Sequence, residues 1–125
     1  MKTVFVVNDD KNLVRVMART LETLLDVEVQ VFTDPILALG AATEHRPDAM
    51  VVDMMMPGAD GISLSRELRR QGVDSPIVIM TAYMPLALDR LLPTNNVRAI
   101  LNKVDGFQAL AQAVKGCLEG MLCPT

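Results

Sequence analysis

The chain has 125 residues, half of them apolar, and a formal net charge of −3. This length predicts one domain that buries about two-thirds of its unfolded surface. The acidic balance argues against nucleic-acid binding, which favours a basic stripe, and no apolar stretch approaches the roughly 20 residues of a membrane span. Because Met1-Lys2 runs directly into a short apolar segment rather than a leader, we expect a cytoplasmic domain.

Short apolar runs alternate with longer segments of helical periodicity along the whole chain. The runs predict five strands and the periodic segments five helices. The expected strands are Thr3–Val7, Glu28–Phe32, Ala49–Asp53, Pro76–Thr81 and Ala99–Asn102. The expected helices are Asn12–Leu25, a helix from Asp34-Pro35 to about Glu44, Ile62–Arg70, Pro85–Leu92 and Phe107–Leu118.

Several of these elements carry recognisable end signals. Asp10 and Asp34 are favoured N-cap residues, Pro35 suits a first helical turn, and Gly72 is a suitable stop after the third helix. The first helix is expected to turn one apolar face to the core. That face comprises Leu13, Val16, Met17, Thr20, Leu21 and Leu24.

The strands are mostly apolar without a break, which predicts a parallel sheet covered by helices on both faces. Right-handed crossovers then give a doubly wound α/β sandwich in one domain, residues 1–125. We expect the strand order 2-1-3-4-5, because it puts the first and third strands side by side at a switch point. That order would bring Asp9 and Asp53 together.

Polar residues follow the apolar runs at four strand ends. Asn8 and Asp9 follow the first strand, Asp53 and Thr81 close the third and fourth, and Lys103 follows the fifth. The carboxyl ends of parallel strands meet at one edge, where open α/β sheets hold their chemistry. Asp9 and Asp53 are hard oxygen ligands suited to Mg²⁺. One Asp53 oxygen could attack a phosphoryl group, with Thr81 and Lys103 placed around the phosphoryl oxygens.

Taken singly, such residues have ordinary structural explanations, and only the joint pattern favours a site. We assign Asp10 to helix capping and His45 to the surface at a helix end, where a cation suits the dipole. Cys117 and Cys123 match no metal or redox spacing and are interpreted as inert. The run Met54–Met56 is assigned to packing and loop positions.

The run from Pro47 to Asp53, with Met56-Pro57 and Asp60-Gly61 behind it, resembles the phosphorylation-site signature of a known family. The family is that of the receiver domains of two-component response regulators, which have the flavodoxin-like, CheY-like fold. Thr81-Ala82 is similar to the family's switch hydroxyl followed by a small residue. The resemblance covers essentially the whole chain.

The resemblance implies that Asp53 accepts a phosphoryl group, which Thr81 and Lys103 then contact. It also implies a site for Mg²⁺ or Mn²⁺ formed by Asp9, Asp53 and the backbone carbonyl of Met55. The implied phosphodonor is a sensor histidine kinase or a phosphotransfer protein. The chain would then be a signalling switch and not an enzyme beyond its own phosphotransfer and dephosphorylation.

Three residues depart from the family pattern. Asn8 stands where the family usually has an acid that reaches the metal through water, so we expect weaker Mg²⁺ affinity, although an amide oxygen can still hold that water. Ile100 replaces an aromatic switch residue, so the common threonine–aromatic relay is not expected. Val104 replaces a proline after Lys103, and we expect a trans peptide bond because a non-proline cis bond costs about 2.5–4 kcal/mol.

Two further expectations concern the phosphorylated form. Met55 and Tyr83 occupy positions that in this family help to set how fast the phosphoryl group is lost to water, and their bulk suggests a form that lasts many minutes. Phosphorylation should reshape the face made by Pro85–Leu92, Ala99–Asn102 and Phe107–Leu118. We expect a homodimer or an output partner to bind there.

The alternative function is a pseudo-receiver, a protein-interaction module that keeps the fold without useful phosphorylation. Asn8, Ile100 and Val104 favour that reading, whereas the intact Asp53 and Lys103 favour the switch. A flavodoxin would need a phosphate cradle after the first strand, and a haloacid-dehalogenase-type phosphatase would need a second Asp where Met55 stands. The kinase, the signal, the output and the presence of further domains are left open.

Overall fold

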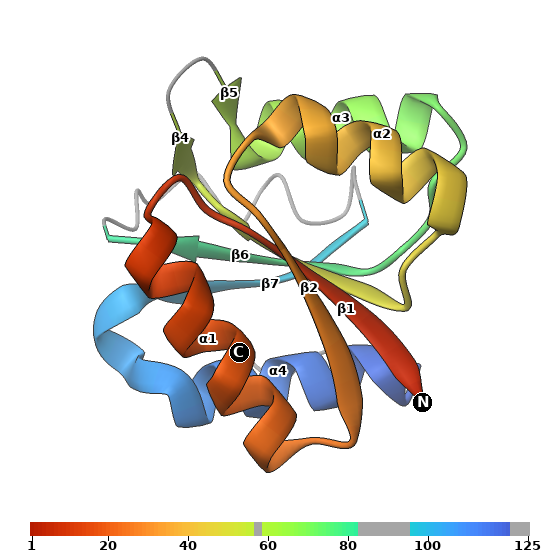
Figure 1. The fold of residues 1–125 in the computed structure, drawn as a ribbon. Helices are drawn as coiled ribbons and strands as arrows, with labels where there is room; N and C mark the ends of the chain where they lie inside the picture. The colour runs from red at the N-terminus through yellow and green to blue at the C-terminus, as the bar shows by residue number, and fades with distance from the viewer. Residues whose placement is uncertain (57–58, 83–95, 121–125) are drawn as a thin grey trace.

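The computed structural model describes residues 1–56, 59–82 and 96–120. Its main element is a five-stranded parallel sheet with helices on both faces (Figure 1). The strands are β1 (Lys2–Val7), β2 (Val27–Phe32), β3 (Ala49–Asp53), β6 (Ile77–Thr81) and β7 (Val97–Asn102). The helices are α1 (Lys11–Leu24), α2 (Pro35–His45), α3 (Gly61–Arg70), the 3₁₀ helix η2 (Lys103–Asp105) and α4 (Gly106–Leu118).

The strand order in the main sheet is β2-β1-β3-β6-β7. Since β6 and β7 are the fourth and fifth strands of this sheet in chain order, the predicted order 2-1-3-4-5 is confirmed. A small antiparallel pair was not predicted, namely β4 (Met55–Met56) with β5 (Ala59–Asp60). The expected helix Pro85–Leu92 lies outside the described residues.

Two helical layers enclose the sheet. Figure 1 shows α1 and α4 on one face and α2 and α3 on the other. Each face has its own apolar core, because alternate residues of every strand point to opposite sides. Val6 and Val51 belong to the core under α1 and α4, and Phe5 and Met50 to the core under α2 and α3. The central strand β3 is buried along its whole length, as a parallel strand covered on both faces should be.

The buried face of α1 differs from the prediction. Val14, Met17 and Leu21 are buried, whereas Val16 and Leu24 are 48% and 44% exposed. Met17 and Leu21 lie on the predicted face, whereas the burial of Val14 was not predicted. The apolar pattern therefore identified the helix and part of the side that contacts the sheet.

Helix ends follow the predicted signals. Asp10 caps α1 by accepting from Asn12 N at 3.0 Å. Asp34 caps α2 by accepting from Ile36 N at 2.8 Å. Gly72, with φ of 84°, follows α3 in the left-handed conformation that glycine adopts without strain. The chain enters and leaves these helices where the sequence indicated.

The positions of His45, Cys117 and Met54–Met56 agree with the structural roles assigned to them from the sequence. His45 is the last residue of α2 and is exposed. Cys117 is buried in the core under α1 and α4, while Cys123 lies outside the described residues. In the methionine run, Met54 and Met56 are buried and Met55 is exposed.

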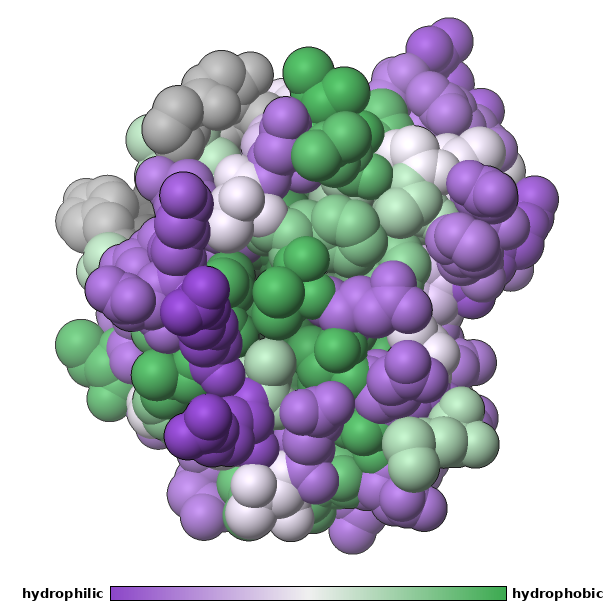
Figure 2. Space-filling view, viewed as in Figure 1, coloured by the Kyte–Doolittle hydropathy of each residue, from purple (hydrophilic) through white to green (hydrophobic). Residues whose placement is uncertain are grey.

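The edge strand β2 gives one side of the molecule a mixed surface. Figure 2 shows apolar side chains in the middle of this face, surrounded by hydrophilic ones. The large apolar side chains exposed on α1, β2 and α2 include Val16, Val31, Ile36 and Leu37. Among the described residues, no helix has the length and apolar character needed to cross a bilayer.

Candidate functional site

The predicted site residues meet at the carboxyl edge of the sheet. Asp53 ends β3 between β1 and β6, and only 5% of its surface is exposed. Its backbone lies opposite Met80 of β6, and the next amide, Met54 N, donates to Met80 O at 2.8 Å. The hydrogen-bonded ladder therefore continues past Asp53, which fixes this carboxylate at the middle of the edge.

Lys103 provides the counter-charge for Asp53. Its Nζ lies 3.1 Å from Asp53 Oδ1, and the lysine side chain is 34% exposed. Lys103 begins η2, whose N-cap is Asn102: Asn102 Oδ1 accepts from Val104 N at 3.1 Å, and Asp105 Oδ2 accepts from Asn102 N at 3.3 Å. This capping box turns the chain directly after β7 and so directs the lysine back over the edge.

Asn8 and Asp9 follow β1 beside Asp53. Val7 pairs with Val52, so the next residues along the two strands, Asn8 and Asp53, are neighbours across the ladder. Asn8 is buried at 2% exposure, and its Oδ1 accepts from Asp10 N at 2.9 Å. Asp9 is exposed. One side chain is therefore enclosed in the site, and the acid next to it stays open to solvent.

Thr81 completes the set. It ends β6, is 3% exposed, and pairs with Asn102 immediately before Lys103. Thr81 directly follows Met80, which lies opposite Asp53. Its partner on β7, Asn102, directly precedes Lys103, which forms the ion pair with Asp53. Four of the predicted site residues, Asn8, Asp53, Thr81 and Lys103, are brought together at one edge, as the topology required.

The segment after Asp53 is held by residues that the sequence analysis did not assign to structural roles. Asp60 caps α3: its Oδ1 accepts from Ser63 N at 2.7 Å. Gly61 N donates to Met54 O at 2.9 Å. A Cβ added at Gly61 would lie 3.0 Å from the carbonyl oxygen of Asp53. The Asp60-Gly61 pair therefore brings the start of α3 against the backbone of Asp53.

The departures from the family pattern are also visible in the structure. Ile100 is buried with the core under α2 and α3. Val104 is 84% exposed, and the Lys103–Val104 peptide bond is trans, as predicted. Tyr83, expected to influence hydrolysis, lies outside the described residues.

The donor atoms at this edge fit a hard divalent cation. Mg²⁺ is usually bound by one or two carboxylates and keeps several waters. Asp9 and Asp53 are two carboxylates at the carboxyl ends of the adjacent strands β1 and β3, and Met55 is exposed at the start of β4. The described residues contain no cluster of three or more His, Cys, Asp or Glu side chains.

A small cavity adjoins the ion pair. It measures about 70 Å³ and opens between the carboxyl edge and the core under α1 and α4. Its lining residues are Asn8, Leu13, Met17, Met80, Lys103 and Phe107. Polar groups from the site thus border one side of the cavity, and apolar side chains form the rest.

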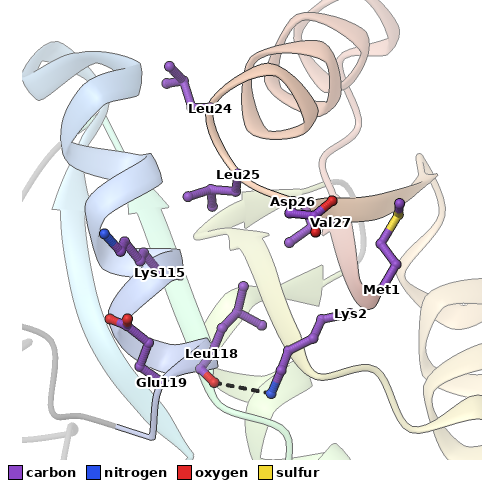
Figure 3. Close-up of a pocket in the computed structure, with 9 residues that line it drawn as sticks. All are labelled: Met1, Lys2, Leu24, Leu25, Asp26, Val27, Lys115, Leu118 and Glu119. Atoms are coloured by element: carbon purple, nitrogen blue, oxygen red, sulfur yellow. Dashed lines mark hydrogen bonds between the residues drawn. The ribbon is translucent and has the colours of Figure 1, made fainter.

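A larger hollow of about 490 Å³ lies at the opposite, amino edge of the sheet (Figure 3). It is bordered by the ends of α1 and α4 and the starts of β1 and β2. Its lining residues are Met1, Lys2, Leu24, Leu25, Asp26, Val27, Lys115, Leu118 and Glu119. Lys2 Nζ donates to Leu118 O at 3.2 Å across it. Its charged side chains are exposed, and none of the predicted site residues is among them.

Most of the chain is similar to known proteins. A family model described as the response regulator receiver domain matches residues 4–115. The curated response regulator MprA of Mycobacterium sp. (strain KMS) is 38% identical over 79 residues, which are 63% of this chain and 34% of that protein. MprA of Mycobacterium leprae (strain TN) is 39% identical over 74 residues, 59% of this chain and 32% of that protein. The match thus spans about a third of these relatives.

Solved structures give the same result over nearly the whole fold. The receiver domain of a Francisella response regulator has a TM-score of 0.87 and 26% identity, with 96% of this chain and 98% of that chain covered. A two-component response regulator of the LuxR family from Aurantimonas sp. SI85-9A1 has a TM-score of 0.88 and 23% identity, with 98% and 88% covered. At that identity the second likeness concerns the fold alone.

Proposed function

Because this chain belongs to the response regulator receiver domain family of two-component systems, we propose that it is a switch phosphorylated on Asp53. The observation that carries the proposal is the ion pair between the buried Asp53 and the partly exposed Lys103, 3.1 Å apart at the carboxyl edge. A carboxylate is expensive to bury. Its placement here, beside buried Asn8 and Thr81, supports a role beyond packing.

The proposed reaction is a direct phosphoryl transfer to Asp53. A carboxylate oxygen of Asp53 forms a bond to phosphorus, the bond from phosphorus to the donor's leaving group breaks, and the leaving group keeps that electron pair. The transition state spreads charge over the phosphoryl oxygens. Lys103 lies close enough to Asp53 to stabilise that charge, and the Thr81 hydroxyl is proposed to contact the same oxygens.

We assign the metal site to Asp9, Asp53 and the backbone carbonyl of Met55, with Mg²⁺ or Mn²⁺ as the ion. When bound, the ion would offset the negative charge that gathers as the two acids and the phosphoryl oxygens come together. Asn8 Oδ1 already accepts from Asp10 N, and its remaining lone pair can hold a metal-bound water.

The partners belong to the same proposal. A sensor histidine kinase or phosphotransfer protein would donate the phosphoryl group in the cytoplasm. Movement of Thr81 and Lys103 onto the new dianion would shift the segments after β6 and β7, and with them the predicted face of Pro85–Leu92, Ala99–Asn102 and Phe107–Leu118. A homodimer or an output partner would bind that face, of which Pro85–Leu92 lies outside the described part of the chain.

Exposed Met55 supports the proposal of a long-lived phosphorylated form. Its side chain is 73% exposed at the rim of the site, and a thioether offers little to orient an attacking water. The phosphoryl group should therefore last many minutes in Mg²⁺ buffer, which the decay of the phosphorylated mass would measure. Loss within seconds would contradict this part of the proposal.

The second candidate is the pseudo-receiver, favoured by Asn8, Ile100 and Val104. Incubation with acetyl phosphate and Mg²⁺, followed by intact-mass measurement, separates the two functions. The switch predicts a gain of one phosphoryl mass that Asp53→Asn abolishes. An unchanged mass in a protein that remains folded by circular dichroism would favour the pseudo-receiver.

A further inference from the structure

The side-chain amide of Asn8 has an unusual environment. Asn8 is only 2% exposed, and its Nδ2 is buried with no hydrogen-bond partner among the described residues. The orientation of the amide is fixed, because Asp10 N–H needs an acceptor and Oδ1 provides it at 2.9 Å. The NH₂ group is therefore the half of the amide that is left unsatisfied.

Buried polar groups in folded proteins are nearly always paired, and an unpaired donor costs free energy. An apolar residue after β1 would avoid that cost. The orphan NH₂ of Asn8 is therefore best explained by an acceptor that is present only in another state of the protein.

The position of Asn8 indicates where that acceptor arises. Asn8 and Asp53 are neighbours at the ends of adjacent strands. By strand alternation both side chains lie on the side of Val6 and Val51, the side covered by α1 and α4. The 70 Å³ cavity bordered by Asn8 and Lys103 lies on that same side. The orphan donor thus stands beside the Asp53–Lys103 pair, next to open space.

Phosphorylation would add hydrogen-bond acceptors beside Asn8 Nδ2. In the unphosphorylated protein, Lys103 Nζ is already paired with Asp53 Oδ1. Transfer of a phosphoryl group turns this carboxylate into an acyl phosphate with three additional strongly accepting oxygens. Lys103 and the Thr81 hydroxyl leave lone pairs on these oxygens unpaired, and a fixed NH₂ on the neighbouring strand adds a donor without adding charge.

We propose that Asn8 Nδ2 donates a hydrogen bond to an oxygen of the acyl phosphate on Asp53, so that Asn8 is a phosphoryl-contacting residue. The inference rests on the proposed phosphorylation of Asp53. The two polar atoms of the Asn8 amide then have different roles: Oδ1 accepts from Asp10 N and so holds the turn, and Nδ2 contacts the phosphorylated side chain.

The direct test is NMR of the whole protein labelled with ¹⁵N at asparagine. Loss of one NH₂ pair in Asn8→Asp assigns the Asn8 signals, and the exposed Asn12 serves as an internal reference. After incubation with acetyl phosphate and Mg²⁺, and with the phosphoryl mass confirmed on the same sample, the Asn8 NH₂ protons should move downfield while those of Asn12 stay.

The failures of the two proposals are distinguishable in this experiment. Absence of the mass gain would overturn the phosphorylation of Asp53 and with it this inference. A full mass gain with unmoved Asn8 NH₂ signals would overturn the inference alone, and would indicate that a resident water satisfies the amide in both states.

The Asn8→Asp variant supplies a second readout. Aspartate has the same shape and still accepts from Asp10 N–H, but it lacks the donor and adds a negative charge beside Asp53. The phosphorylated variant should lose its phosphoryl group about tenfold faster, the effect of removing one charge-assisted hydrogen bond. Mg²⁺ affinity, measured by titration of backbone amide shifts, should rise. A phosphorylated lifetime equal to or longer than that of the unsubstituted protein would contradict the proposal.

Discussion

The two edges of the parallel sheet differ in the polar side chains that they bury. At the carboxyl edge Asn8, Asp53 and Thr81 are at most 5% exposed. At the amino edge the charged residues Lys2, Lys115 and Glu119 border an open hollow and are themselves exposed (Figure 3). Both edges are formed by the same strands, so the difference arises from which residues follow or precede each strand.

The difference between the edges shows where polar groups are buried at a cost in free energy. Burying polar groups is unfavourable unless they are paired, and an orphan donor such as Asn8 Nδ2 is more costly than an exposed charge. The carboxyl edge includes the unpaired donor, whereas at the amino edge the buried Ser75 is paired, its Oγ donating to Pro47 O, and the charged side chains of the hollow are exposed. We therefore expect substitutions at the carboxyl edge to have large effects and those of the exposed charges at the amino edge to have small ones.

The largest change in stability is expected at Gly61. In Gly61→Ala the new Cβ would lie 3.0 Å from the Asp53 carbonyl oxygen, so the backbone of either residue must move. Urea unfolding should show a loss of about 1–3 kcal/mol. The matched control is Gly40→Ala in α2, where an added Cβ has open space, and which should gain about 0.5–1 kcal/mol. Equal effects at the two glycines would contradict the close contact at the carboxyl edge.

A smaller loss is expected for Lys103→Met. The substitution removes the only cation paired with the buried Asp53 carboxylate in the described structure, and partial exposure of Lys103 limits the cost to about 1–2 kcal/mol. A double-mutant cycle with Asp53→Asn isolates the energy of the pair, because Lys103→Met should lower the free energy of unfolding less once the carboxylate has been removed. Strictly additive free energies of unfolding would show that the ion pair contributes nothing to stability.

At the amino edge, Lys2→Met should change little. The variant loses one exposed hydrogen bond, from Lys2 Nζ to Leu118 O. The free energy of unfolding should change by less than about 0.5 kcal/mol, and the yield of phosphorylation from acetyl phosphate should stay the same. A marked fall in that yield would mean that the two edges are coupled.

The smallest expected effect involves Glu67 and Arg70 near the end of α3. Glu67 Oε1 accepts from Arg70 Nη2 at 2.6 Å, and this bond lowers the pKa of Glu67 from 4.5 to about 2. A lowered folded-state pKa stabilises the protein above the unfolded value, and that stabilisation disappears as the pH falls from about 4.5 to 2. The melting-temperature difference between the protein and Glu67→Gln should therefore shrink over that range. A difference independent of pH would contradict this assignment.

Much of this architecture could be predicted because the signals were local. The unbroken apolar run ending at Asp53 indicated a buried parallel strand, and the caps at Asp10 and Asp34 were visible as residue types. The placement of Asp53 and Lys103 at one edge followed from the prediction of a parallel sheet, since parallel strands end at a shared edge.

Other features depend on contacts that no local pattern specifies. Val16 of α1 is exposed although the apolar pattern placed it on the buried face. Strands β4 and β5 have two residues each, too few for an apolar run to indicate them. The unsatisfied NH₂ of Asn8 became visible only once its other half was seen bonded to Asp10. The sequence alone indicated that Asn8 lacks the negative charge usual at this position, and the structure adds that its Nδ2 is an unpaired hydrogen-bond donor among the described residues.

The most direct test of the central claim is to locate the phosphoryl group by residue. After incubation with acetyl phosphate and Mg²⁺, borohydride reduces an aspartyl phosphate to homoserine, and tandem mass spectrometry of the peptides identifies the reduced position. We predict homoserine in place of Asp53, with Asp9 and Asp10 unchanged. Unmodified Asp53 in a folded protein, or reduction at another acid, would contradict the assignment of the buried carboxylate as the phospho-acceptor.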